Sequence, residues 1–203
     1  MKTYRFLLIG GLLAAGAAVA GGWSNVLFSF DGSIGVQPFR SAAGVPTLNT
    51  VAGVPPGGVP WGMTSFEATV KNDGDIRARG TGVLLWGADI IGTRGGPRQV
   101  ILSLFCRNPP APPAPIGSLQ TTPFNSEPVD LDEDGDFSLR GKLTDATGAT
   151  PPSNCGDSID NRPVLLVRSV TPANPTTGAP ATPGAWFAAG IIAPKHGKGH
   201  DRD

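Results

Sequence analysis

The chain has 203 residues, with 16 basic and 16 acidic side chains and a formal net charge of zero. This balance lacks the excess of Lys and Arg that marks a nucleic-acid-binding protein, so no nucleic-acid partner is expected. Glycine (29) and proline (21) are abundant and only 16% of residues are charged, a composition typical of short strands joined by many turns.

The N-terminus predicts a secretory signal peptide over residues 1–20. Lys2 and Arg5 precede an uncharged apolar stretch, and Ala18-Val19-Ala20 supplies the small residues that a signal peptidase requires. The apolar stretch is too short for a stable membrane span. Cleavage near Ala20 predicts a secreted or periplasmic protein with 14 basic and 16 acidic side chains. No membrane span is expected in this mature chain, because no later apolar segment is long enough.

Two hairpins are predicted in the first part of the mature chain. Residues 26–36 predict two short strands around Asp31-Gly32, a dipeptide typical of a two-residue hairpin turn. Residues 63–81 alternate apolar and polar side chains on either side of Asn72-Asp73-Gly74. This alternation predicts a hairpin with one buried face and one exposed face.

The later strands are more apolar. Residues 83–86 are apolar on both faces, which predicts a strand near the centre of a sheet. Further strands are predicted at residues 99–106, 126–131, 136–143, 163–170 and 186–192. About eight or nine short antiparallel strands over residues 21–193 favour an all-β fold, a single antiparallel β-sandwich.

The segments between these strands are rich in proline and glycine. Residues 53–60, 108–115 and 171–184 are interpreted as loops, because proline cannot donate to a strand ladder. Residues 194–203 are polar and glycine-rich, which predicts a disordered tail that carries both histidines of the chain. A catalytic histidine needs a fixed position, so no catalytic residue is assigned.

The two cysteines, Cys106 and Cys155, are expected to form a disulfide. An oxidising compartment favours their pairing, and neither has the CxxC spacing or neighbouring histidine of a metal site.

The sharpest chemical motif is the acidic stretch DLDEDGDF at residues 130–137. Asp130, Asp132 and Asp134, followed by Gly135, match the first half of a calcium-binding loop. The twelfth position is Gly141, where such a loop needs a glutamate, and the flanking residues alternate as in strands. Two interpretations stay open: a tight turn between two strands, and a weak calcium site. No other cofactor is expected.

A carboxylate pair would allow glycosidase chemistry. The glutamates are Glu67, Glu127 and Glu133, and the tryptophans that could stack on a sugar are Trp23, Trp61, Trp86 and Trp186. Nothing in their spacing brings two glutamates together.

Several of these motifs together resemble a group of small secreted bacterial all-β proteins of unassigned function with one disulfide. The motifs are FDGSIGVQPF, the hairpin containing FEATV and DGDIRARG, the DGDF turn, PVLLVRS after the second cysteine, and WFAAGI. The resemblance covers about residues 28–192 and implies an all-β fold and secretion. It implies no activity and no functional residue.

These observations favour a secreted, non-enzymatic module. It would bind a polymer or a protein at a cell surface, or serve a structural role in the envelope, with an extracellular or envelope partner. The alternatives are a carbohydrate-active hydrolase with paired carboxylates and a calcium-stabilised adhesin-like domain.

Overall fold

The computed structural model of the chain describes residues 25–37, 39–40 and 43–193. The predicted signal peptide and tail lie outside these residues. The described part contains strands and one 3-10 helix, η1 (Ile159–Asn161). The strands are β1 (Val26–Gly35), β2 (Phe39–Arg40), β3 (Pro46–Thr47), β4 (Trp61–Gly62), β5 (Ser65–Lys71), β6 (Asp75–Thr81), β7 (Leu84–Leu85), β8 (Gln99–Phe105), β9 (Phe124–Asn125), β10 (Val129–Asp130), β11 (Phe137–Lys142), β12 (Val164–Thr171) and β13 (Thr182–Ile192).

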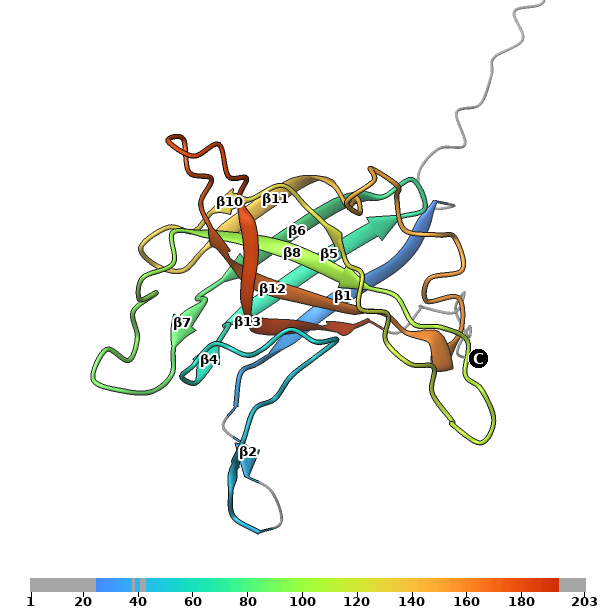
Figure 1. Cartoon of the computed structure of the whole chain (residues 1–203), viewed down its shortest axis with the longest axis horizontal. Coiled ribbons are helices and arrows are strands. Elements are labelled where there is room, and N and C mark those ends of the chain that lie inside the picture. Colours follow the sequence, from blue (N-terminus) through green and yellow to red (C-terminus); the bar gives the residue numbers. More distant parts are fainter. Residues whose placement is uncertain (1–24, 38, 41–42, 194–203) are drawn as a thin grey trace, which may run out of the picture.

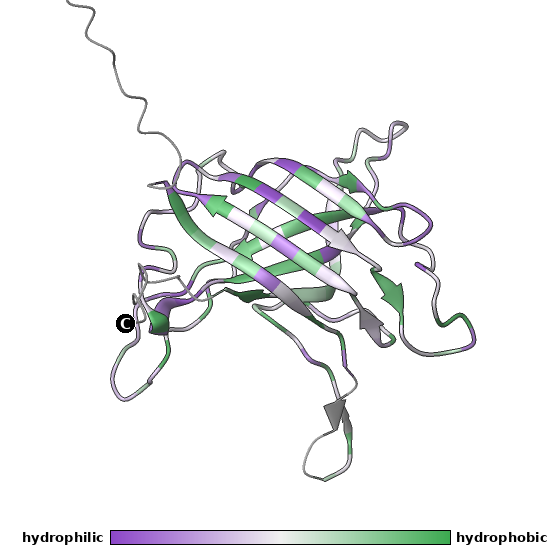
Figure 2. Cartoon of the chain, turned by 180° about the vertical axis from the view of Figure 1, so that it is seen from behind, coloured by the Kyte–Doolittle hydropathy of each residue, from purple (hydrophilic) through white to green (hydrophobic). Residues whose placement is uncertain are grey.

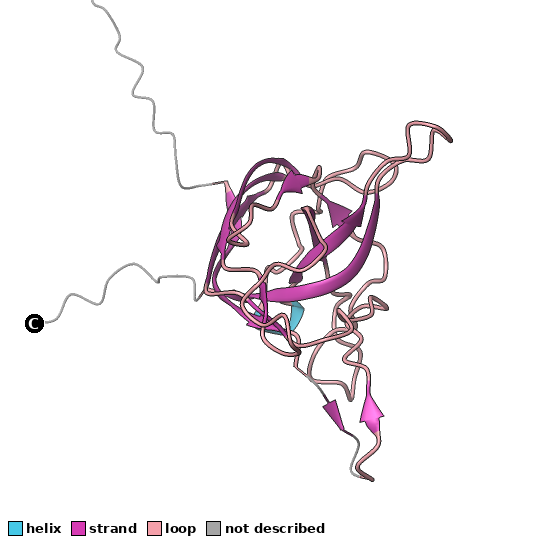
Figure 3. Cartoon of the chain, turned by 90° about the vertical axis from the view of Figure 1, so that its left-hand side faces the viewer, coloured by secondary structure: helices cyan, strands magenta, loops and turns pink. Residues whose placement is uncertain are grey.

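One antiparallel sheet of nine strands forms the body of the protein. Its order is β10-β8-β12-β13-β1-β5-β6-β11, and β9 also pairs with β8. The sheet curls round on itself into a nearly closed, barrel-like wall (Figures 1 and 3). The strands β2 and β3 form a separate projecting hairpin, and β4 pairs with β7.

The all-β, antiparallel prediction is confirmed, but the expected two-layer sandwich is not what the structure shows. Each strand of the main sheet hydrogen-bonds to the next, so one continuous sheet supplies both walls around the core. The right-handed twist of neighbouring strands allows a sheet of this size to close on itself in this way. Strand alternation alone does not distinguish the two arrangements, because each buries one face.

Two contacts bring the edges of the sheet together. At one point Asn125 and Thr144 form an isolated antiparallel bridge, with N···O distances of 2.7 and 3.0 Å. At the other, the acidic turn at residues 131–136 connects β10 directly to β11. Edge strands carry unpaired backbone groups, so these contacts satisfy part of both edges.

The core lies inside the curled sheet, on the inward faces of the strands. On β5 and β6 every second residue is buried, which confirms the hairpin predicted around Asn72-Asp73-Gly74. The largest fully buried residues include Phe30, Phe66, Ile76, Leu102, Leu104 and Leu165.

The strand β8 is buried on both faces. Its inward face meets the core, and loops cover its outward face and that of β12 and β13. One of these loops is fixed to β13, because Trp186 N donates to Pro55 O (3.0 Å) and Gly57 N donates to Trp186 O (2.8 Å). The sheet therefore has one covered outer face and one open outer face.

Three local predictions are wrong. The strand predicted at residues 126–131 forms only as the two-residue β10. Asp31-Gly32 does not end a strand: β1 runs through it, and Gly32, with φ of 83°, lies where the register with β13 shifts between Phe30 and Ser33. A bulge of this type and a tight hairpin turn both need a residue with positive φ, so the dipeptide fits either. Residues 83–86 form only the two-residue β7, outside the main sheet, and Trp86 is exposed.

The predicted disulfide is confirmed. Cys106, at the end of β8, is bonded to Cys155 with a Cα–Cα distance of 5.4 Å, and both residues are buried. It fixes the long connection between β11 and β12 to the edge of the core.

Replacing both cysteines with serine should lower the free energy of unfolding by about 4 kcal/mol, because the bond closes a loop of 49 residues. Urea unfolding of the variant, beside the wild type with and without reductant, measures this. A loss below about 1 kcal/mol would contradict the assigned role of the bond.

Candidate functional site

The acidic stretch forms a hydrogen-bonded turn. Asp132 Oδ1 accepts hydrogen bonds from the backbone N–H groups of Asp134 (3.0 Å) and Asp136 (2.8 Å). Asp136 Oδ1 accepts from Gly82 N at 2.9 Å, and Gly135 O accepts from Val83 N at 2.8 Å. The turn therefore joins two edges of the sheet and also fixes the chain that follows β6.

The three candidate calcium ligands have different surroundings. Asp130, on β10, accepts a hydrogen bond from Gln99 Nε2 (3.0 Å). Asp132 accepts backbone hydrogen bonds within the turn, and Asp134 is exposed. Among the residues that the structure describes, no three His, Cys, Asp or Glu side chains are grouped so that they could hold a metal ion. A calcium role for Asp130, Asp132 and Asp134 stays a prediction.

Glu133 in this turn neutralises a buried cation. The Arg94 side chain is only 6% exposed, and its Nη2 lies 2.6 Å from Glu133 Oε1, while the exposed Arg98 approaches the same oxygen at 3.4 Å. The hydrogen bond and the charge of Arg94 lower the pKa of Glu133 below its ordinary value. The pair fixes the turn to the loop that precedes β8.

The glutamates considered for glycosidase chemistry lie on different elements. Glu67 is on the outer face of β5, Glu127 lies between β9 and β10, and Glu133 is in the acidic turn. No glutamate lines the hollow around Arg77 and Arg140 or the hollow around Arg168. A hydrolase function stays a prediction, and no pair of carboxylates in these hollows supports it.

Two of the candidate tryptophans pack internally. Trp61 stacks on Phe187 with ring centroids 4.1 Å apart, and Trp186 is 2% exposed, with Nε1 donating to Asn49 O. Trp86 is 52% exposed, and Trp23 lies outside the described residues. Only Trp86 among the described tryptophans is therefore available to a ligand at the surface.

The open outer face of the sheet carries a cluster of cations, here called the basic strip. Hydrophobic and hydrophilic residues alternate along β5, β6 and β11 (Figure 2). The apolar residues are buried and face the core, and the charged ones face solvent. The basic strip consists of Lys71, Arg77, Arg79, Arg140 and Lys142.

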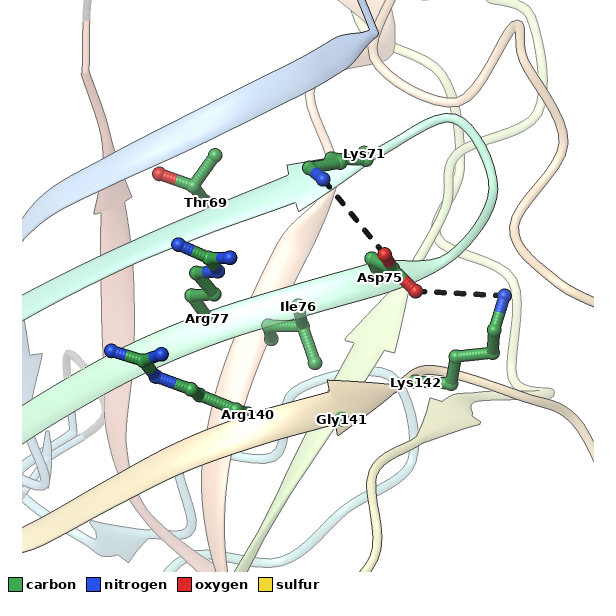
Figure 4. A pocket seen from close by; sticks show the side chains of 8 residues that line it. All are labelled: Thr69, Lys71, Asp75, Ile76, Arg77, Arg140, Gly141 and Lys142. Carbon is green, nitrogen blue, oxygen red and sulfur yellow. Dashed lines mark ion pairs between the residues drawn. The ribbon is translucent and has the colours of Figure 1, made fainter. Parts of the chain in front are cut away.

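Two arginines lie side by side at the centre of the basic strip. Arg77 on β6 is directly opposite Arg140 on β11, and Thr69 on β5 is opposite Arg77 on the other side. In Figure 4 the Arg140 side chain extends from β11 toward β6, and the Arg77 side chain extends from β6 toward β5. Like charges directly opposite each other on a sheet destabilise it, so this pair costs free energy in the unliganded protein.

The strip has fewer acids than cations. Asp75 lies 3.8 Å from Lys71 Nζ and 3.5 Å from Lys142 Nζ (Figure 4). In the described part of the chain, Arg77, Arg79 and Arg140 take part in no ion pair. Glu67 on β5 is directly opposite Arg79 on this face, whereas Arg77 and Arg140 have no carboxylate opposite them in the described sheet, so these two guanidinium groups are free to bind an anion.

The centre of the strip is a shallow hollow of about 390 Å³. Its lining residues are Thr69, Lys71, Asp75, Ile76, Arg77, Arg140, Gly141 and Lys142. Guanidinium groups bind carboxylate, sulfate and phosphate through paired N–H donors. The row of cations on neighbouring strands suits a long anionic ligand lying across the strands.

Sequence reasoning missed the basic strip. The sequence shows that Arg77 and Arg79 alternate with apolar residues in one predicted strand. Arg140 belongs to another strand far along the chain, so the sequence does not show that it is their neighbour. Its position opposite Arg77 depends on the pairing of β6 with β11. The signal that could have found it was the matching alternation of Arg140 and Lys142 in another predicted strand.

The fold and the surface together define the class: an all-β protein with a curled antiparallel sheet, one disulfide and a basic outer face. Comparison with protein-family models, curated proteins and solved structures finds no match for this chain. Within the described ranges, no helix has the length and apolar character needed to cross a membrane.

Replacing Asp132 with alanine should lower the free energy of unfolding by about 1 kcal/mol or more, because two backbone N–H groups of the turn lose their acceptor. Asp134→Ala is the matched control and should have little effect. Thermal melts with calcium and with a chelator separate the interpretations. If the variants differ from the wild type only when calcium is present, the calcium site is favoured and this prediction fails.

Replacing Glu133 with glutamine should lower the melting temperature at about pH 7, because Arg94 loses its ionised partner. The pKa of Glu133 is lowered from 4.5, so its contribution is present above that pH and is lost as the pH falls through the lowered pKa. The melting temperatures of variant and wild type should therefore converge in acid.

Arg98→Gln is the control for this second prediction, because Arg98 is exposed and its contact with Glu133 is longer. It should change the melting temperature little. A Glu133→Gln difference that is independent of pH would contradict the ion-pair explanation.

Proposed function

We propose that this protein is a secreted, non-enzymatic β-domain that binds a polyanionic polymer, an acidic polysaccharide of a cell surface, through the basic strip. The observation that carries the proposal is the cross-strand pair of Arg77 and Arg140, which has no carboxylate partner among the described residues. An anion bound between the two guanidinium groups would remove their repulsion and add charge-assisted hydrogen bonds.

The chemistry of the strip favours a polysaccharide over a nucleic acid. Proteins that bind single-stranded nucleic acid interleave cations with aromatic side chains on which bases stack. The outward residues of β5, β6 and β11 include no aromatic residue. Neutral hydroxyl groups of Ser65, Thr69 and Ser138 accompany the cations instead, and these can hydrogen-bond to sugar hydroxyls.

The location is part of the proposal. The predicted signal peptide supports secretion, and the disulfide fits an oxidising compartment. The resemblance of the sequence motifs to those of small secreted bacterial all-β proteins also supports secretion.

The double variant Arg77→Gln, Arg140→Gln should weaken binding to polygalacturonate or dextran sulfate about tenfold or more, because each arginine supplies charge-assisted hydrogen bonds. Affinity electrophoresis or calorimetry at two salt concentrations measures this. Wild-type binding should weaken with salt, and the variant should depend on salt less.

The control is Arg162→Gln, which removes one exposed arginine next to η1 and away from the strip. It should leave binding unchanged. Because the double variant removes a like-charge pair, its melting temperature should be equal to or higher than that of the wild type. Unchanged binding in the folded double variant would refute the proposal, and tighter binding of duplex DNA than of either polysaccharide would point to a nucleic-acid ligand.

A further inference from the structure

A buried arginine on the covered outer face has no acidic partner. Arg168, on β12, is 9% exposed. Its Nε donates to Gly184 O (2.9 Å), Nη2 to Pro183 O (3.1 Å) and Nη1 to Ser103 Oγ (3.3 Å). All three acceptors are neutral, and no carboxylate of the described residues pairs with this guanidinium.

This arrangement is costly in the unliganded protein. Arginine is almost never fully buried without a charged partner, because its charge loses hydration. Burial accordingly lowers the pKa of Arg168, although an arginine stays protonated in proteins. A guanidinium has five N–H donors, so two N–H groups remain after the three hydrogen bonds described.

Arg168 lines a hollow between the loops that cover β8 and β12. The hollow has a volume of about 410 Å³, within the range of small-molecule sites. Its lining residues are Ala52, Gly53, Val54, Phe105, Thr121, Pro123, Asn125, Arg168 and Pro183. The walls are mainly apolar, and Arg168, Asn125 and Thr121 supply the polar side chains.

One hydroxyl group connects two of these polar side chains. Ser103 Oγ accepts from Arg168 Nη1 and donates to Asn125 Oδ1 at 2.6 Å. Ser103 is itself completely buried, so its hydroxyl group fixes the side chains of Arg168 and Asn125 from the sheet side of the hollow. Because Asn125 uses its oxygen in this contact, its Nδ2 group remains as a donor beside the arginine.

The wall formed by residues 51–54 is also well defined. Val51 and Val54 form two backbone hydrogen bonds, 3.1 and 2.8 Å long, around Ala52 and Gly53. Ala52 has a φ of 50°, in the left-handed region that alanine rarely adopts. A strained residue held in place beside a hollow is a feature common at binding sites.

We propose that this hollow binds the carboxylate of a small organic acid with an apolar body. Arg168 supplies the positive charge and two free N–H groups, Asn125 Nδ2 and the Thr121 hydroxyl supply further donors, and Phe105, Val54 and the prolines contact the apolar part. One cation and largely apolar walls suit a single carboxylate better than a multiply charged group. The site is independent of the basic strip, which lies on the other strands of the sheet.

The test is a titration of the folded protein with benzoate, followed by two-dimensional ¹H–¹⁵N NMR. Benzyl alcohol is the uncharged control and inorganic phosphate the small anion without an apolar body. Benzoate should shift the side-chain resonances of Arg168 Nε–H and Asn125 NH₂, and the two controls should shift them much less. No saturable shift with benzoate, or equal shifts with benzyl alcohol, would overturn the proposal.

Two variants sharpen the test. Arg168→Met removes the charge and should abolish the benzoate response of the Asn125 NH₂ group. Asn125→Asp keeps an acceptor for Ser103 and gives Arg168 a permanent carboxylate, so it should raise the melting temperature and abolish benzoate binding even if Arg168→Met fails to fold. Asn174→Asp makes the same change in an exposed turn of the β12–β13 loop and should leave binding unchanged. Benzoate binding by Asn125→Asp with wild-type affinity would refute the assigned site.

Discussion

The structure depends on satisfying the two edges of one long antiparallel sheet. Without closure, β11 and the β9–β10 segment would each present unpaired N–H and C=O groups, which invite pairing with other chains. The bridge between Asn125 and Thr144 and the turn after β10 bring these edges together. The core exists because the sheet curls, since the same inward side chains would have no opposite wall in an open sheet.

The acidic turn contributes to this closure in three ways. Asp132 closes the loop internally, Asp136 fixes the chain after β6, and Glu133 neutralises the buried Arg94. Each of these acidic side chains thus stabilises the closed sheet through a different contact. The residues of the turn need no shared ligand to explain why they are acidic.

Closure also gives the sheet two chemically different outer faces. Loops cover β8, β12 and β13, and beneath them Arg168 lies in a largely apolar hollow. The face of β5, β6 and β11 is open and carries the basic strip. Both faces place arginine where its charge lacks an acidic partner among the described residues. We interpret these two features as separate anion sites, one a row of exposed cations across several strands, the other an open hollow with a single buried cation.

The sequence by itself determined what depends on local pattern: the all-β class, the hairpin around Asn72-Asp73-Gly74, the buried strands β8 and β12, the last strand β13, and the pairing of Cys106 with Cys155. It could not decide between a bulge and a turn at Asp31-Gly32, because both use a glycine with positive φ. It also could not place Arg140 opposite Arg77, or Asn125 near Arg168, because both juxtapositions arise from strand register and loop packing between distant segments. Alternation in a strand specifies which side chains share a face, and only the tertiary structure decides which strands, and hence which charges, become neighbours.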